Sequence, residues 1–248
     1  MTVSDPSTVQ FLENMPQAAS GPPLQRALMG TRHFLAEEYR VLASKVASLA
    51  TGRFTTIGIV SAVPGEGKTT VALGLAAALA RTSSQRVLLL EADLHQPALE
   101  RYLGLPRVDG VSEWLLGRST SVPVRTISPP GFAVITAGRE ALPRPELIGS
   151  DRMGALLGAC QLNFGFLVVD CPPLGPLADA VAIQDLIDGF LLVVRARRAP
   201  REVIQHSVSR LRPGSIQGVV FNDRPHLLPG AYRYGRLYRY GLGRDRRH

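Results

Sequence analysis

Short apolar runs alternate along this chain with longer stretches in which apolar residues recur at helical spacing. The runs lack the strict alternation of a half-exposed strand, which indicates strands that are covered on both faces. Strands that alternate with helices predict a doubly wound, mainly parallel α/β sheet, in which ligands bind at the carboxyl ends of the strands. Six strands are expected, at residues 54–60, 86–91, 132–136, 166–170, 190–195 and 218–221.

The remaining pattern divides the chain into three segments. Residues 1–30 mix Ser, Pro, Gln and Asn without periodicity and are expected to be disordered, whereas residues 31–223 are expected to form the α/β domain. Apolar residues at near-helical spacing predict an amphipathic helix at the start of this domain, over residues 31–50. Its polar side carries Glu37 and Arg40.

Charge and aromatic content set residues 224–248 apart as a tail. Of the formal net charge of +8, seven Arg and one Asp from position 224 onward contribute +6, so the preceding residues carry only +2. A segment of this composition buries too little apolar area to fold alone, and we expect a flexible arm. It holds four of the six tyrosines, which are Tyr232, Tyr234, Tyr238 and Tyr240.

Residues 62–69 fit the A-x-x-x-x-G-K-T pattern of a phosphate-binding P-loop. The loop lies between the predicted strand 54–60 and an Ala- and Leu-rich helix predicted over 69–80, which favours a P-loop over a plain Gly-rich turn. In a P-loop, backbone N–H groups and the helix dipole bind phosphate, and we expect the Lys68 ammonium to reach phosphate in a solvent-open site. The expected nucleotide-binding residues are Pro64, Gly65, Glu66, Gly67, Lys68, Thr69 and Thr70.

Two other predicted strands end in carboxylates. Asp170 follows the run Phe-Leu-Val-Val in the Walker B arrangement, and Glu91 and Asp93 are two residues apart on one side of an extended segment. Phosphoryl transfer needs a metal ion and a carboxylate that orients the attacking oxygen. We therefore expect Thr69, Asp93 and Asp170 to bind Mg²⁺, and Lys68, Glu91, Asp93 and Asp170 to be catalytic. A single acid could instead cap a turn or helix, but three acids beside a P-loop favour catalysis.

Other features bear less on the chemistry. Arginines 195, 197, 198 and 201 follow the predicted strand 190–195 and could face phosphate or lie in a solvated loop. The two cysteines show neither disulfide nor metal spacing, and reduced core thiols are expected. The N-terminus lacks a signal pattern and no apolar run reaches the roughly 18 residues of a membrane span, so we expect a cytoplasmic protein.

Taken together, these motifs resemble those of the bacterial tyrosine kinases of polysaccharide export, in their standalone cytosolic form. The resemblance rests on the P-loop, the two-acid strand end, the Walker B strand that runs into Cys171-Pro-Pro, and the tyrosine cluster. Three further segments are similar to segments of the family. Glu37-Glu-Tyr-Arg resembles its E-x-x-R helix, and Pro143-Arg-Pro-Glu-Leu-Ile resembles its N-P-x-E-L-L segment. Gly218-Val-Val-Phe-Asn222 resembles a late strand, and Asp179 also matches the family pattern.

The resemblance implies a SIMIBI-type P-loop domain that uses ATP and Mg²⁺ to phosphorylate its own tail tyrosines between neighbouring subunits. It also implies that Asn222 binds the nucleotide and that Glu37 and Arg40 take part in self-association. The implied partners are a transmembrane polysaccharide co-polymerase, which activates the kinase at the inner face of the cell membrane, and a cognate tyrosine phosphatase. The implied role is control of exopolysaccharide or capsule synthesis and export.

Four positions depart from the family pattern. In the two-acid motif, Glu91 replaces the family's first Asp and His95 replaces its Arg. Ala43 replaces the second Arg of the E-x-x-R-x-x-R helix, and Arg144 replaces the Asn of the N-P-x-E-L-L segment. A Glu keeps the charge but reaches one methylene further, and displacements of about 1 Å can cost on the order of 100-fold in rate. If Glu91 is a weakened version of the family's acid, an Asp at position 91 should raise kinase activity, whereas a fall in activity would mean that the site is rebuilt around the longer side chain.

Two other functions are compatible with parts of the sequence. A partitioning-type ATPase has a signature Lys early in its P-loop, where this chain has Val63, and it has no use for a tyrosine tail. A nucleotide-binding pseudokinase or scaffold could use the tail to engage an acidic surface. Arg- and Tyr-rich tails also bind nucleic acid by charge and stacking. Four clustered tyrosines beside a phosphoryl-transfer site favour the kinase, and nucleic acid is not an expected partner.

Overall fold

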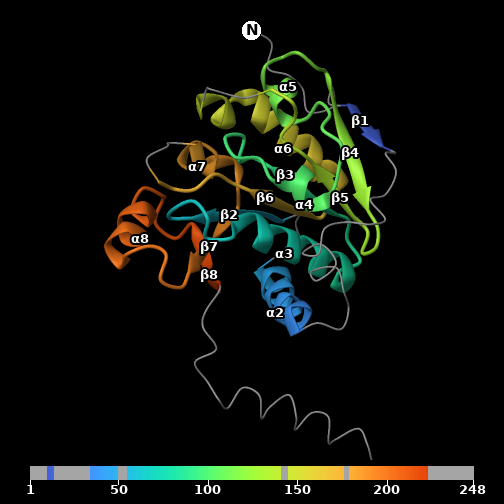
Figure 1. Ribbon diagram of the computed structural model, residues 1–248. Coiled ribbons are helices and arrows are strands. Elements are labelled where there is room, and N and C mark those ends of the chain that lie inside the picture. Colours follow the sequence, from blue (N-terminus) through green and yellow to red (C-terminus); the bar gives the residue numbers. More distant parts are fainter. Residues whose placement is uncertain (1–9, 14–33, 50–54, 141–144, 176–178, 223–248) are drawn as a thin grey trace, which may run out of the picture.

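A mainly parallel sheet of eight strands forms the centre of the structure, with helices on both of its faces (Figure 1). The computed structural model describes residues 10–13, 34–49, 55–140, 145–175 and 179–222. The strand order is β1-β4-β5-β3-β6-β2-β7-β8, and every neighbouring pair is parallel except β4 with β5. The predicted doubly wound α/β fold is confirmed.

The elements follow in alternation along the chain. The strands are β1 (Gln10–Glu13), β2 (Thr55–Ser61), β3 (Val87–Glu91), β4 (Ser121–Ile127), β5 (Phe132–Ile135), β6 (Phe166–Asp170), β7 (Gly189–Arg195) and β8 (Ile216–Asn222). The α-helices are α2 (Phe34–Leu49), α3 (Lys68–Thr82), α4 (Leu99–Leu103), α5 (Val111–Leu115), α6 (Asp151–Asn163), α7 (Asp179–Ala182) and α8 (Arg201–Val208). Two short 3₁₀ helices are η2 (Pro145–Gly149) and η3 (Gln184–Leu186).

All six predicted strands are present, with ends shifted by at most two residues. Strand β4 was not predicted because it contains Pro123 and carries no continuous apolar run. Its pairing with β5 covers only Arg125 to Ile127, so Pro123 lies outside that antiparallel ladder, and it is opposite Leu12 in the parallel pairing with β1 at the edge of the sheet.

Strand β1 lies within residues 1–30, which the sequence predicts to be disordered. Its backbone pairs in parallel with β4, from Gln10 opposite Ser121 to Glu13 opposite Val124. Four residues carry too little pattern to predict a strand, and the pairing depends on the open edge that β4 provides.

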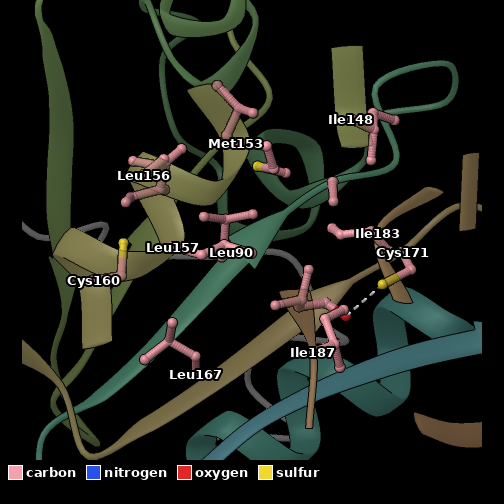
Figure 2. Close-up of a cluster of buried hydrophobic side chains, with 14 of the residues drawn as sticks. Leu90, Ile148, Met153, Leu156, Leu157, Cys160, Leu167, Cys171, Ile183 and Ile187 are labelled. Atoms are coloured by element: carbon pink, nitrogen blue, oxygen red, sulfur yellow. Dashed lines mark hydrogen bonds between the residues drawn. The ribbon is translucent and has the colours of Figure 1, made fainter. Parts of the chain in front are cut away.

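The apolar core lies in two layers, one on each face of the sheet. In β3, Leu88 and Leu90 belong to the layer beneath α5 and α6, whereas Val87 and Leu89 belong to the layer beneath α3. Figure 2 shows Leu90 among the side chains of the first layer. Because both faces are covered, these strands show no alternation of apolar and polar residues. Edge strand β8 differs, since it alternates between half-buried and exposed positions.

Helix α2 packs against α3, the helix that follows the P-loop. The Tyr39 ring lies over Gly74, where an added Cβ would collide with it, and its hydroxyl donates to the Thr70 carbonyl at 3.3 Å. Burial raises the pKa of Tyr39 to about 12. Ala43, in place of the family's second Arg, is fully buried in the same interface. The polar face of α2 stays exposed and holds the Glu37–Arg40 ion pair at 2.6 Å.

Candidate nucleotide-binding site

The carboxyl ends of five neighbouring parallel strands form one edge of the sheet. Their order is β3-β6-β2-β7-β8. Five predicted features therefore follow one another along this edge: the two-acid strand end, the Walker B Asp, the P-loop, the arginines that follow β7, and Asn222. The site residues come from segments up to about 150 positions apart, and only the parallel pairing brings them together. The site therefore lies where this fold class binds its ligands.

The P-loop connects β2 to α3 and contains two glycines with left-handed backbone angles. Gly65 has φ 80° and Gly67 has φ 96°, conformations that L-residues with a Cβ rarely adopt. A Cβ at Gly67 would also collide with the Asn222 amide. The backbone N–H groups at the start of α3 are therefore available to an anion without a side chain in the way.

The Glu66 side chain has a structural role in this loop. The residue is fully buried, and its carboxylate accepts hydrogen bonds from the backbone N–H groups of Val63 at 3.0 Å and Arg195 at 3.2 Å. These bonds close the loop on itself and tie it to the end of β7. Of the residues predicted to bind nucleotide, Glu66 can thus contribute its backbone, while its carboxylate is engaged elsewhere.

Lys68, Asp93 and Asp170 lie together at the strand ends, as the sequence predicts. The Lys68 Nζ is 3.7 Å from an Asp93 carboxylate oxygen, and the Asp170 carbonyl accepts the Ala92 and Asp93 N–H groups at 2.8 and 3.0 Å. The other Asp93 oxygen accepts the Gln96 N–H at 3.1 Å. Lys68 is only 7% exposed, so the solvent-open position expected for it is wrong. Burial strengthens each charge interaction in this cluster.

Asp170 is buried without hydrogen-bond partners among the described residues. The residue is 1% exposed, and neither carboxylate oxygen accepts a well-formed hydrogen bond from the part of the chain that the structure describes. Burial raises the pKa of Asp170 to about 7; the neighbouring Thr69 hydroxyl and Lys68 charge lower it, whereas Glu91 and Asp93 raise it further. A buried carboxylate with unused oxygens fits a hard cation such as Mg²⁺, which prefers oxygen ligands. Thr69 and Asp93 are the neighbouring oxygen donors.

The Glu91 carboxylate is bonded to backbone groups outside this cluster. One of its carboxylate oxygens accepts the N–H groups of Ala98 and Leu99, the latter at 2.8 Å, and the other accepts the Ala137 N–H at 3.0 Å. Burial raises the pKa of Glu91, and the three backbone bonds oppose that change. The carboxylate thus joins the end of β3 to the start of α4 and to the loop after β5.

These contacts add an effect on stability to the change in activity expected for an Asp at position 91. We predict that Glu91→Asp lowers the free energy of unfolding by about 2–4 kcal/mol, since the shorter side chain cannot reach both α4 and Ala137, and each buried N–H left unpaired costs about 1–3 kcal/mol. Urea denaturation measures this loss. Glu37→Asp, at an exposed position of α2, is the control and should change the stability by less than about 0.5 kcal/mol. Equal stability of Glu91→Asp and the parent chain would contradict the assignment.

Other predicted residues are placed as follows. Asn222 ends β8 and donates to the Glu66 carbonyl at 2.9 Å. Thr69 and Thr70 lie in the first turn of α3, half-buried. Glu37 and Arg40 lie on the exposed face of α2 and pair with each other. The four tail tyrosines and Arg144 lie outside the described residues.

The structure adds basic residues whose roles the sequence left open or gave no sign of. Arg195 and Arg198 donate to P-loop carbonyls, so two of the four clustered arginines do lie beside the candidate phosphate site. Arg210, which follows α8, donates to the carbonyls of Leu174 and Gly175 in the loop after β6. A lone Arg after a helix has no local pattern from which that contact could be predicted.

The fold, the strand–loop–helix and the flanking acids define a P-loop nucleotide-binding domain. The sequence model of the CobQ/CobB/MinD/ParA nucleotide binding domain matches residues 57–223, and the chain belongs to this family. It is 32% identical over 179 residues to the tyrosine-protein kinase etk of Escherichia coli strain K12, a match that covers 71% of this chain and 24% of that protein. It is 31% identical over 208 residues to the succinoglycan biosynthesis transport protein ExoP of Rhizobium meliloti, covering 77% and 26%.

A solved structure supports the same placement. The kinase domain of Escherichia coli tyrosine kinase ETK superposes with a TM-score of 0.74 at 27% identity, over 88% of this chain and 87% of that domain. The chain spans about a quarter of the length of the two curated relatives, so the similarity concerns one domain of each.

Proposed function

We propose that this chain is an ATP-dependent protein-tyrosine kinase that phosphorylates its own C-terminal tyrosines. The observation that carries the proposal is the buried group of Lys68, Asp93 and Asp170 beside the P-loop, in which the Asp170 carboxylate accepts no hydrogen bond of good geometry from the residues that the structure describes. This group has the charges and ligands that phosphoryl transfer requires. Relatives named as tyrosine kinases supply the acceptor class.

In the proposed reaction the tyrosine oxygen forms a bond to the γ-phosphorus of ATP, and the bond from that phosphorus to the β–γ bridging oxygen breaks. ADP leaves with the electron pair, and the tyrosine proton passes to the Asp93 carboxylate. The Lys68 ammonium and the P-loop N–H groups stabilise negative charge on the phosphate oxygens. Asp170, with Thr69 and Asp93, would hold Mg²⁺, which supplies further neutralisation of that charge. Glu91 acts by holding the strand end in place.

The proposed acceptors are Tyr232, Tyr234, Tyr238 and Tyr240. The other two tyrosines are poor acceptors because they lie in helices: Tyr39 of α2 is packed against Gly74 of α3, and Tyr102 is part of α4. The tail carries a formal charge of +6, so it is attracted to the acidic strand ends of a neighbouring copy. Each phosphotyrosine adds about −1.5 to −2, and three or four of them cancel that charge.

The cellular setting is part of the proposal. Self-association would use the exposed Glu37–Arg40 face of α2. A transmembrane polysaccharide co-polymerase would bind and activate the kinase at the inner face of the membrane, and a tyrosine phosphatase would reverse the modification. One relative is named for succinoglycan biosynthesis transport, which supports a role in exopolysaccharide synthesis and export. In the described part of the chain, no helix has both the length and the apolar character of a membrane span.

The decisive experiment is incubation of the pure chain with Mg-ATP, alone and with the cytosolic segment of a candidate activator, followed by mass spectrometry. Phosphotyrosine confined to residues 232–240 is the expected result. ATP binding and hydrolysis without phosphotyrosine under both conditions would overturn the kinase and favour an ATPase or scaffold of the same fold.

Replacing the four tail tyrosines with Phe tests acceptor and assembly together. We predict loss of most phosphotyrosine and retention of the associated form, because the tail keeps its positive charge and cannot acquire the negative charge that repels it from a neighbour. Light scattering with Mg-ATP and activator measures association, and the phosphorylated parent chain should have the lower mass. Tyr102→Phe is the control and should behave as the parent. Full phosphotyrosine in the Phe variant, or equal mass of the two parent forms, would contradict the prediction.

A further inference from the structure

Three consecutive carbonyl groups of the P-loop accept hydrogen bonds from side chains that are at least 130 positions away in the sequence. Asn222 Nδ2 donates to the Glu66 carbonyl at 2.9 Å, Arg195 Nη1 to the Gly65 carbonyl at 3.3 Å, and Arg198 Nη2 to the Pro64 carbonyl at 3.4 Å. All three donors come from the ends of β7 and β8 or from the connection to α8. They approach the loop from one side.

The direction of these carbonyls fixes the direction of the N–H groups that follow them. A trans peptide unit is planar, so its C=O and N–H point in opposite directions. Holding the carbonyls of residues 64–66 toward the arginines and Asn222 therefore turns the N–H groups of residues 65–67 toward the other side of the loop. Successive N–H groups that face one way form a concave anion site.

The pairing of β7 with β8 fixes the positions of two of these donor side chains. Arg195 and Asn222 are cross-strand partners at the ends of β7 and β8, and the Ala196 N–H donates to the Asn222 carbonyl at 3.1 Å. The buried Glu66 carboxylate accepts the Arg195 N–H and so binds the same strand end to the loop. Gly67 has no room for a Cβ beside the Asn222 amide.

We propose that Arg195, Arg198 and Asn222 form a clamp that aims the P-loop N–H groups at the phosphates of a bound nucleotide. They are positioning residues that act through the loop backbone rather than by contact with the nucleotide base. This inference rests on the proposed function, since it concerns how that site binds ATP. Asn222 contributes most, because its bond is the shortest and is half-buried, whereas the two guanidinium bonds are longer and exposed.

Probes with and without a base test the clamp. Titration calorimetry with Mg-ADP, Mg-GDP and Mg-pyrophosphate compares the parent chain with Asn222→Ala and with the double variant Arg195→Met/Arg198→Met. We expect Asn222→Ala to lower the affinity for all three probes by the same factor, about tenfold. The double variant should lower these affinities by about fivefold. Arg201→Met is the charge control: Arg201 is exposed, and within the described residues it donates no hydrogen bond to the P-loop.

The outcomes separate the clamp from other roles. A loss confined to ADP and GDP, or a changed ratio between them, would overturn the clamp and assign Asn222 to the base. Unchanged affinities in both variants, an equal loss in the Arg201 control, or a parent chain that binds ADP but not pyrophosphate would overturn it as well. A parent chain that binds none of the probes would overturn the proposed function itself. Urea denaturation checks that each variant is folded. If Asn222→Ala does not fold, the affinities of the Arg195→Met/Arg198→Met variant, whose substituted bonds are exposed, test the clamp.

Discussion

Replacing Lys68 with Met is expected to remove tail phosphorylation and to weaken Mg-ADP binding by roughly 10- to 100-fold. The ammonium is buried beside Asp93, so its bond to a phosphate oxygen is charge-assisted and poorly screened, worth about 1.5–3 kcal/mol. Without it, the phosphates would lie near the carboxylates of Asp93 and Asp170 with no cation from the P-loop between them. Calorimetry measures the affinity, and phosphotyrosine mapping measures the transfer.

The composition of the chain offers a matched control for this variant. Lys68 and Lys45 are the two lysines of the sequence, and Lys45 is exposed on α2. Lys45→Met should leave Mg-ADP affinity within about twofold of the parent, because an exposed charge on another helix is screened. Unchanged affinity of Lys68→Met would remove the phosphate-binding role of the loop.

Asp170→Asn is expected to abolish phosphorylation and, in the absence of Mg²⁺, to make the chain more stable at pH 8. Burial raises the pKa of Asp170 from 3.8 to about 7, so the native state holds this proton to a higher pH than the unfolded state does. The stability contributed by the protonated group is fully present below pH 3.8 and is lost as the pH rises to about 7. An Asn side chain does not titrate. We therefore expect the free energy of unfolding of Asp170→Asn, relative to that of the parent chain, to increase by about 2–4 kcal/mol between pH 5 and pH 8.

Urea denaturation at the two pH values measures the difference. Asp185→Asn is the control, because Asp185 is an exposed residue paired with Arg212. Its effect on the free energy of unfolding should differ by less than about 1 kcal/mol between the two pH values. Added Mg²⁺ should stabilise the parent chain at pH 8 and leave Asp170→Asn unchanged, since a ligand that binds only the native state stabilises it. The same stability difference at both pH values would contradict the raised pKa, because it would mean that Asp170 has the same pKa in the native and unfolded states.

Glu91 and Asp170 show why the roles of similar residues could not be separated in advance. Each is an acid at the end of an apolar strand, and the two are opposite one another in the β3–β6 register. Glu91 is bonded to three N–H groups from α4 and the loop after β5, whereas Asp170 has none among the described residues. Their difference arises from how α4 and the loop after β5 fold back onto the end of β3, and the pattern of the two strands does not encode that packing.

The sequence by itself determined the parallel sheet, the P-loop and the acids at its edge. Continuous apolar runs predict strands that are covered on both faces, and a glycine-rich loop between a strand and a helix is a local signal. Only the tertiary structure decided that Lys68 is buried, that Glu91 accepts bonds from backbone N–H groups, and that Asn222 and two arginines bind the P-loop carbonyls. Burial and hydrogen-bond partners depend on which distant strand ends become neighbours, and that is fixed by the packing of the whole sheet.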